Sequence, residues 1–246
     1  MKAIILCAGY GTRMKPYTET YQKTMIPIHG KPLLEYLIKG IKLAGFKDFI
    51  IVVGYNKEQI IDYFQEGEKW DINIEYIEQY DLNGTGGALL LCEDSITDQH
   101  FFLTWGDTLV AYDVYREVYE VFKNESPDFI LVTNYVHDPY KGAAVYCEGN
   151  YCIDIVEKPR KGKSTTNLNN AGMFILSRDI FDILKMQTPS KRGEIEVPDA
   201  IRHGIKEKHW KLRVVKIEKD QFYGDFGDVK KYEKLVKNTD WLNLLY

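Results

Sequence analysis

This 246-residue sequence predicts an α/β fold with a mostly parallel (mixed) central sheet. Two observations support the prediction. Short, continuous apolar runs, such as residues 3–7, are typical of parallel strands that are covered on both faces. These runs alternate with segments such as residues 33–44, in which apolar side chains recur every three or four positions, as in amphipathic helices. Alternating strands and helices favour right-handed crossovers and therefore parallel pairing.

The other expected elements follow in chain order. In the first half we expect strands at 49–53, 72–77 and 101–105 and helices at 58–64 and 84–91, with Gly45 as the C-cap of the first helix. The second half is less regular. There we expect strands at 128–136, 143–146, 152–156, 173–176 and 212–217, and helical segments at 180–184, 197–203 and 228–241. No repeat or flexible linker interrupts the pattern, which predicts one domain over residues 1–246.

Charge and cysteine content narrow the class of protein. Lys and Arg number 32 and Asp and Glu number 36, so the net charge is −4. A chain without excess basic charge is not expected to bind nucleic acid or an anionic membrane as its main partner. The four cysteines show no C-x-x-C spacing, and no apolar run is long enough to cross a bilayer. We therefore expect a cytoplasmic protein with free thiols.

A glycine-rich loop follows the first predicted strand. Residues 8–16 read Ala-Gly-Tyr-Gly-Thr-Arg-Met-Lys-Pro. Glycines allow close approach of the backbone to a ligand, and Arg13 and Lys15 add positive charge beside the backbone N–H groups. Ligands of open parallel sheets bind beyond the carboxyl ends of the strands. The loop thus predicts a phosphate site. Met14 occupies the third glycine position of a dinucleotide fingerprint, which argues against a dehydrogenase, and no Walker motif is present.

Two neighbouring motifs carry a family resemblance. Residues 9–18 resemble the pattern G-x-G-T-R-L-x-P-x-T, and residues 23–32 resemble K-P-M-x-P-V-x-G-K-P, both typical of sugar-1-phosphate nucleotidyltransferases. Glucose-1-phosphate thymidylyltransferases and uridylyltransferases belong to that family. The resemblance implies a Rossmann-like three-layer sandwich of the nucleotide-diphospho-sugar transferase type. It also implies that the N-terminal half binds the nucleotide and the C-terminal half binds the sugar phosphate.

The resemblance assigns phosphate-binding residues. The triphosphate would lie along a backbone segment that comprises Ala8, Gly9, Gly11 and Thr12. Arg13 and Lys23 would bind phosphates and stabilise the departing pyrophosphate. The family usually has prolines at the positions of Gln22 and Thr24, on either side of Lys23.

Base and metal sites are implied in the same way. Gln79 and Gly84 resemble the family's arrangement for a pyrimidine, because an amide offers one donor and one acceptor to the base edge. Guanylyl-specific relatives tend to have an acidic residue in place of Gln79, which favours dTTP or UTP over GTP; a flipped amide would also fit cytosine. Asp107 and Asp225 resemble the family's two Mg²⁺ ligands, and Asp107 is expected to be catalytic together with Arg13 and Lys23.

The acceptor side of the resemblance lies in the second half. Lys158 would bind the phosphate of the sugar and Glu157 its hydroxyl groups, while Gly142 and Asn170 would line the same pocket. Glu196, in the segment Arg-Gly-Glu-Ile-Glu, is a weaker candidate for this pocket.

The resulting hypothesis is transfer of a nucleotidyl group from a pyrimidine nucleoside triphosphate to a sugar 1-phosphate, with release of pyrophosphate. The acceptor phosphate is already anionic, so catalysis would consist chiefly of positioning and charge neutralisation. Two alternatives stay open: the same chemistry with CTP or GTP and a heptose or non-sugar phosphate, or a non-catalytic regulatory homologue. The sequence contains no hexapeptide repeats, so we expect no fused acetyltransferase. It leaves homo-oligomerisation undecided.

Overall fold

The computed structural model describes residues 1–190 and 192–246. The chain forms two compact units that interleave along the sequence. Unit 1 comprises Met1–Tyr80, Thr104–Tyr119 and Asp220–Tyr246, and unit 2 comprises Asp81–Leu103 and Glu120–Lys219. Strand β6 (His100–Trp105) and helix α4 (Tyr112–Glu125) each contribute residues to both units.

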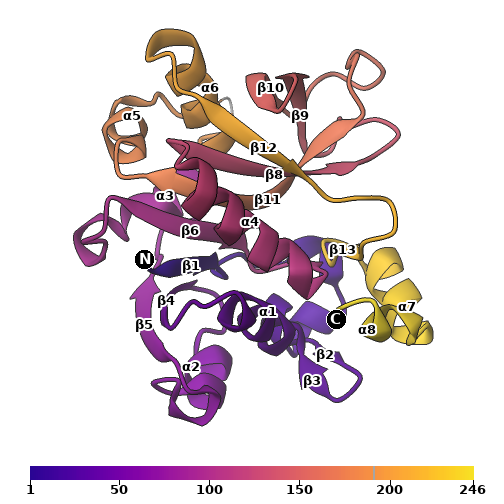
Figure 1. Cartoon of the computed structure of the whole chain (residues 1–246). Helices are drawn as coiled ribbons and strands as arrows, with labels where there is room; N and C mark the ends of the chain where they lie inside the picture. Colours follow the sequence, from indigo (N-terminus) through magenta and orange to yellow (C-terminus); the bar gives the residue numbers. More distant parts are fainter. Residues whose placement is uncertain (191) are drawn as a thin grey trace. The chain divides into compact units, whose positions relative to one another are not determined.

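Unit 1 is built on parallel strands in the order β5-β4-β1 (Figure 1). Their bounds are Ala3–Leu6 for β1, Asp48–Val53 for β4 and Asn73–Glu78 for β5. Ala3 pairs with Phe49, and Asp48 pairs with Asn73. Helices α1 (Leu33–Leu43) and α2 (Glu58–Phe64) connect these strands. The carboxyl ends of the strands therefore lie at one edge, where ligands of such sheets bind.

Short elements complete unit 1. Strand β7 (Thr108–Val110) pairs antiparallel with β13 (Tyr223–Asp225), and β2 (Pro27–Ile28) pairs with β3 (Lys31–Pro32). The 3₁₀ helices are Thr12–Met14, Tyr17–Glu19, Lys23–Met25 and Glu68–Trp70. At the end of the chain lie α7 (Val229–Lys237) and α8 (Asp240–Asn243).

Unit 2 is a mixed sheet in the order β6-β11-β8-β12-β10-β9. Strand bounds are Phe129–Tyr135 for β8, Ala143–Glu148 for β9, Tyr151–Glu157 for β10, Leu168–Ser177 for β11 and Leu212–Lys216 for β12. Strands β8 and β12 are parallel, whereas β8–β11, β9–β10 and β10–β12 are antiparallel. The helices are α3 (Thr85–Leu90), α5 (Ile180–Met186), α6 (Val197–Glu207) and the 3₁₀ turn Glu93–Ser95.

The predicted α/β class with a mixed sheet is confirmed, but several local features differ from the prediction. Helix α4 was not predicted. The segment predicted as one helix over residues 228–241 is two helices, α7 and α8, separated at Asn238 and Thr239 (Figure 1). Strand β11 begins five residues earlier than expected, because the segment before Met173 pairs with β8 through a register shift. That shift contains Gly172, whose φ of 74° is easily adopted only by glycine.

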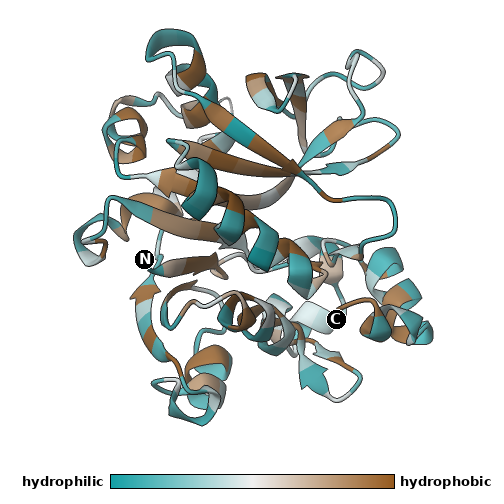
Figure 2. Ribbon diagram, in the orientation of Figure 1, coloured by the Kyte–Doolittle hydropathy of each residue, from teal (hydrophilic) through white to brown (hydrophobic). Residues whose placement is uncertain are grey.

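The distribution of hydropathy follows from these pairings. In Figure 2, β6 and β8 are mainly hydrophobic, whereas β5 alternates between hydrophobic and hydrophilic residues. Their burial agrees, because Phe101–Leu103 and Phe129–Val132 are almost completely buried while β5 is largely half-exposed. All four cysteines are free thiols. Among the described residues, the helices are too short or too polar to span a lipid bilayer.

Candidate active site

The loop after β1 exposes backbone N–H groups. Ala8 is buried and its carbonyl oxygen accepts a hydrogen bond from the N–H of Tyr55, whereas Gly9 and Tyr10 are exposed. Within the described part of the chain, the N–H groups of Gly9, Tyr10 and Gly11 have no hydrogen-bond acceptor. Such groups need a partner, and a phosphate oxygen can supply it.

Gly11 fixes the shape of this loop. Its φ is 62°, and a Cβ there would lie 2.8 Å from Cγ2 of Thr18 and 3.1 Å from Cβ of Lys23. The carbonyl oxygen of Gly11 accepts hydrogen bonds from the Thr18 hydroxyl at 3.0 Å and from the Met14 N–H at 2.8 Å. Glycine is therefore required by both the backbone angle and the space. The same turn directs the chain into the 3₁₀ helix that contains Thr12 and Arg13.

Lys23, in the 3₁₀ helix Lys23–Met25 that follows the glycine loop, forms an ion pair with Asp107, in the loop after β6. The Lys23 Nζ donates to Oδ2 of Asp107, and the two side chains are 15% and 23% exposed. Burial raises the pKa of Asp107, but the Lys23 ammonium and, less strongly, the Arg13 guanidinium outweigh it. The net effect is a pKa below the ordinary value, so the carboxylate is ionised at neutral pH.

Asp225 lies beside Asp107 because of the β7–β13 ladder. Asp225 pairs with Thr108, the residue after Asp107, and the N–H of Phe226 donates to the Asp107 carbonyl oxygen at 2.9 Å. Asp225 Oδ1 accepts from the N–H of Gly227 at 2.7 Å, and Oδ2 is ion-paired with Lys231. An Arg13 Nη2 atom would be 3.5 Å from a Cβ on Gly227. Unit 1 thus brings together Arg13, Lys23, Asp107 and Asp225.

Two aspartates on adjoining backbone segments fit the requirements of Mg²⁺. This ion takes one or two protein carboxylates and completes its shell with water and substrate phosphate oxygens. Asp107 and Asp225 offer that donor set, and their present partners are lysine side chains that can turn instead to phosphate. No group of three or more His, Cys, Asp or Glu side chains suited to a metal occurs among residues 1–190 and 192–246.

The two candidate base-binding residues, Gln79 and Gly84, belong to different units. Gln79 directly follows β5; its N–H donates to the Val53 carbonyl oxygen at 2.8 Å, and its side chain is 6% exposed. A surface loop position is therefore excluded for this glutamine. Gly84 belongs to unit 2, where its φ is 99° and a Cβ would lie 2.4 Å from the carbonyl oxygen of Ile195.

The predicted acceptor residues meet within unit 2. Glu157 is the last residue of β10 and pairs with Ala143, and the N–H of Lys158 donates to the carbonyl oxygen of Gly142 at 2.7 Å. A Cβ on Gly142 would lie 2.2 Å from Oδ1 of Asn169. Gly142, Glu157 and Lys158 therefore form one group, with β11 beside them.

Asn170 lies in β11, not in a turn. Its Oδ1 accepts from the N–H of Gly172 at 2.8 Å, within the register shift of the strand. The sequence reasoning missed Asn169, whose Nδ2 donates to Oδ1 of Asn134 at 3.0 Å and which packs on Gly142. It also missed Lys231, the partner of Asp225. The Asn-Asn-Ala-Gly segment offered a signal for Asn169, but no local pattern marks Lys231.

An acidic cluster surrounds Glu157. Glu196 is buried and accepts hydrogen bonds from Thr85 Oγ1 at 2.9 Å and Arg192 Nη2 at 2.6 Å. Burial, and then the charges of Glu196 and Asp199, raise the pKa of Glu157 to about 8, although Arg192 opposes them. At neutral pH the Glu157 carboxyl group is therefore mostly protonated and can both donate and accept hydrogen bonds.

This pKa predicts a pH-dependent stability. Between pH 4.5 and 8 the folded chain holds a proton on Glu157 that the unfolded chain releases, so this contribution is complete below pH 4.5 and is lost as the pH rises through 8. We expect Glu157→Gln to unfold several degrees above the wild type at pH 9 and at a similar temperature at pH 5, since about 1 kcal/mol shifts Tm by roughly 2–4 °C at this size. Thermal unfolding of both proteins at both pH values measures this. The same Tm difference at pH 5 and pH 9 would contradict the assignment.

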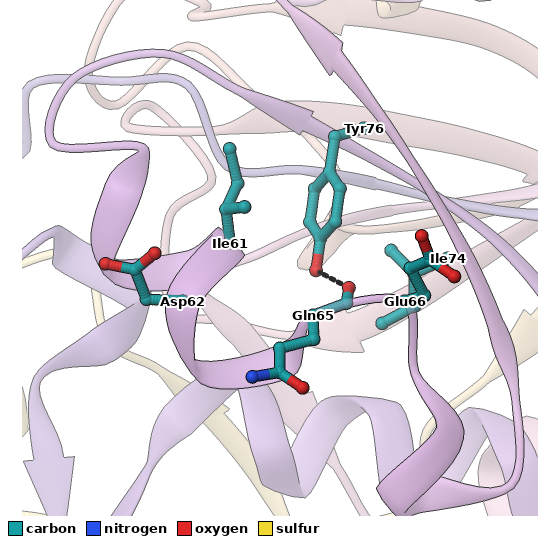
Figure 3. A pocket seen from close by; sticks show the side chains of 6 residues that line it. All are labelled: Ile61, Asp62, Gln65, Glu66, Ile74 and Tyr76. Carbon is teal, nitrogen blue, oxygen red and sulfur yellow. Dashed lines mark hydrogen bonds between the residues drawn. The ribbon is translucent and has the colours of Figure 1, made fainter.

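A separate hollow of about 580 Å³ lies between α2 and β5 (Figure 3). It is lined by Ile61, Asp62, Gln65, Glu66, Ile74 and Tyr76, and the Tyr76 hydroxyl donates to the Gln65 carbonyl oxygen at 2.6 Å. None of the predicted site residues lines it. Its two carboxylates also make it unsuited to an anionic nucleotide, so we assign it no part in the chemistry.

Comparison with known proteins identifies the family. Residues 2–240 match the sequence profile described as nucleotidyl transferase. The chain belongs to this nucleotidyl transferase family, as the glycine loop and the lysine motif predicted.

Individual relatives make the likeness more specific. The chain is 39% identical over 243 residues to the bifunctional protein GlmU of Methanococcus maripaludis, covering 99% of this chain and 55% of that protein. It is 32% identical to a glucose-1-phosphate thymidylyltransferase of Streptomyces griseus, covering 82% and 56%. The chain thus spans little more than half the length of these relatives. The crystal structure of a UDP-glucose pyrophosphorylase complexed with UDP-glucose superimposes with a TM-score of 0.85 at 28% identity, covering 96% of this chain and 97% of that one.

Proposed function

We propose that this protein transfers a nucleotidyl group from dTTP or UTP to a hexose 1-phosphate, yielding a nucleotide sugar and pyrophosphate. The convergence of Arg13, Lys23, Asp107 and Asp225 beside a loop of exposed backbone N–H groups is the observation that carries the proposal. Both the thymidylyltransferase relative and the UDP-glucose pyrophosphorylase structure support a pyrimidine nucleotide and a hexose.

In this proposal unit 1 holds the triphosphate. The N–H groups of Gly9 and Gly11 bind phosphate oxygens, and Arg13 and Lys23 neutralise the charge that grows on pyrophosphate as it leaves. Asp107 and Asp225 would hold Mg²⁺, which when bound supplies further positive charge to the phosphates. Together these residues lower the repulsion between two polyanionic substrates.

Unit 2 holds the acceptor. Lys158 binds the sugar phosphate, whose oxygen attacks the α-phosphorus in line with the departing pyrophosphate. Its side chain is 47% exposed, so it is accessible to a ligand. Glu157 and Asn170 hydrogen-bond the sugar. The attacking phosphate is an anion and requires no general base; orientation and charge neutralisation account for the rate.

The substrate pair can be identified directly. The protein is incubated with Mg²⁺, each of dTTP, UTP, CTP and GTP, and a panel of hexose, amino-sugar, heptose and non-sugar phosphates, and pyrophosphate release is measured. We expect turnover with dTTP or UTP and a hexose 1-phosphate. Turnover only with CTP or GTP, or only with another acceptor, would refute the substrate assignment. Nucleotide binding without any turnover would indicate a regulatory homologue.

A further inference from the structure

Gln22, the residue before Lys23, is a buried amide with every polar atom engaged. Its side chain is 1% exposed. The Nε2 group donates to the carbonyl oxygen of Cys7 at 2.5 Å, and Oε1 accepts from the N–H of Thr24 at 2.6 Å and from its hydroxyl at 2.7 Å. A buried amide is costly unless it is hydrogen-bonded in this way, so the conformation of Gln22 is strongly specified.

These hydrogen bonds fasten the residues on both sides of Lys23. Cys7 directly follows β1, and its N–H donates to the Val52 carbonyl oxygen at 2.8 Å, so it is part of the rigid sheet edge. The Gln22 amide ties the lysine loop to that edge, and Thr24 is tied to Gln22. Lys23 lies between the two anchored residues, at the start of its 3₁₀ helix.

The same cluster also contacts the loop of Asp107. A Cβ on Gly106 would lie 2.6 Å from Sγ of Cys7 and 2.9 Å from Cγ2 of Thr24, so these side chains pack directly on the Gly106 backbone. The N–H of Gly106 donates to the Leu6 carbonyl oxygen at 3.0 Å. The side chain of Thr24 thus packs between the lysine loop and Gly106, the residue before Asp107.

We propose that Gln22 is a positioning residue: together with Thr24 it holds Lys23 in register with Asp107 at the phosphate site. Its φ of −59° lies in the range that a proline ring would impose, so the chain has the same backbone angle here without the ring. The expected effect on catalysis rests on the proposed function. The placement of Lys23 by Gln22 and Thr24 does not depend on it.

The first test is kinetic. Gln22→Met keeps the side-chain length and removes all three hydrogen bonds, and Thr24→Val removes only the hydroxyl donor. A displacement of about 1 Å can cost roughly 10²-fold in rate, so we expect a fall in kcat of about 10-fold for Gln22→Met and less for Thr24→Val. KM for the sugar phosphate should stay near the wild-type value, because unit 2 is untouched. Ile180→Val, a buried change in unit 2, controls for a general loss of stability.

A double-mutant cycle separates positioning from stability. If Gln22 acts through Lys23, Gln22→Met should lower kcat in the wild-type background and have little further effect in a Lys23→Ala background, because residues that act as a unit are non-additive. An equal loss in both backgrounds, or wild-type kcat for Gln22→Met, would overturn the inference. Should Gln22→Met fail to fold, Thr24→Val enters the same cycle.

An activity-independent readout distinguishes this inference from the proposed function. Lysines are acetylated briefly with a water-soluble reagent and quantified by mass spectrometry, with Lys185 of unit 2 as internal reference. Releasing Lys23 from Asp107 should speed its labelling in Gln22→Met on the order of fivefold, the factor that corresponds to the loss of about 1 kcal/mol of ion pairing. Unchanged labelling would contradict the inference, whereas a wild type without nucleotidyl transfer but with faster Lys23 labelling in the variant would contradict only the proposed function.

Discussion

Asp107→Asn is expected to lower kcat at least ~10²-fold, by analogy with the loss of one preorganised charge-stabilising group. Asparagine keeps the shape of the side chain and its backbone pairing with Phe226, but it removes the charge that pairs with Lys23. It also weakens the two-carboxylate site, since a neutral amide is a poorer ligand for Mg²⁺ than a carboxylate. Steady-state kinetics with the substrates found in the panel, over a range of Mg²⁺ concentrations, measure the effect.

Asp71→Asn provides a matched control for this variant. Asp71 is also paired with lysines, Lys47 and Lys42, but it lies just before β5, at the amino ends of the parallel strands and not at the carboxyl-end edge. Its φ of 53° is well tolerated by asparagine. We expect wild-type kcat for Asp71→Asn. A kcat for Asp107→Asn within a few-fold of the wild type, in a folded protein, would show that the carboxylate is not needed for the reaction.

Arg13→Ala is expected to reduce kcat by a similar factor, ~10²-fold or more. Arg13 is exposed, approaches Gly227 and acts electrostatically on Asp107, so its guanidinium belongs to the same charged group. Arg13→Lys keeps the charge but loses the planar fork that binds two phosphate oxygens, and it should recover only part of the rate. Single-turnover measurements at saturating triphosphate separate the chemical step from binding.

Arg116→Ala, an exposed change on α4, is the control for loss of one positive charge. It should leave both kcat and the thermal unfolding temperature near their wild-type values. If Arg13→Lys equalled the wild type, a point charge would suffice and bidentate binding by Arg13 would be wrong. If Arg13→Ala were also unimpaired, Arg13 would have no part in stabilising pyrophosphate.

Local sequence patterns predicted much of the fold, because parallel strands and amphipathic helices leave periodic traces. The helix 58–64 matches α2, and the strand 49–53 lies within β4. Helix α4 was overlooked although its buried residues Tyr112, Val114, Tyr115 and Val118 follow a helical spacing. The pairing of β7 with β13 has no local trace, since it joins segments from distant parts of the chain.

The candidate site shows the same division. Family-like motifs singled out Arg13, Lys23, Asp107 and Asp225, and the structure brings these four together, while their roles stay predictions. Gln22 was noted only as a departure from the usual prolines. The role proposed for it rests on its hydrogen bond to Cys7 and on the packing of Thr24 against Gly106, which the sequence alone does not reveal because both are tertiary contacts.

The interleaving of the two units along the sequence has a consequence for folding during synthesis. Most of unit 1 leaves the ribosome first, then the remainder of unit 2 is synthesised, and only afterwards do residues 220–246 appear. Until Tyr223–Asp225 has emerged, β7 lacks its antiparallel partner and Asp107 lacks the neighbouring carboxylate. A nascent or truncated chain that stops before β13 can present the glycine loop and Lys23, yet it lacks the second carboxylate on which the proposed magnesium site depends.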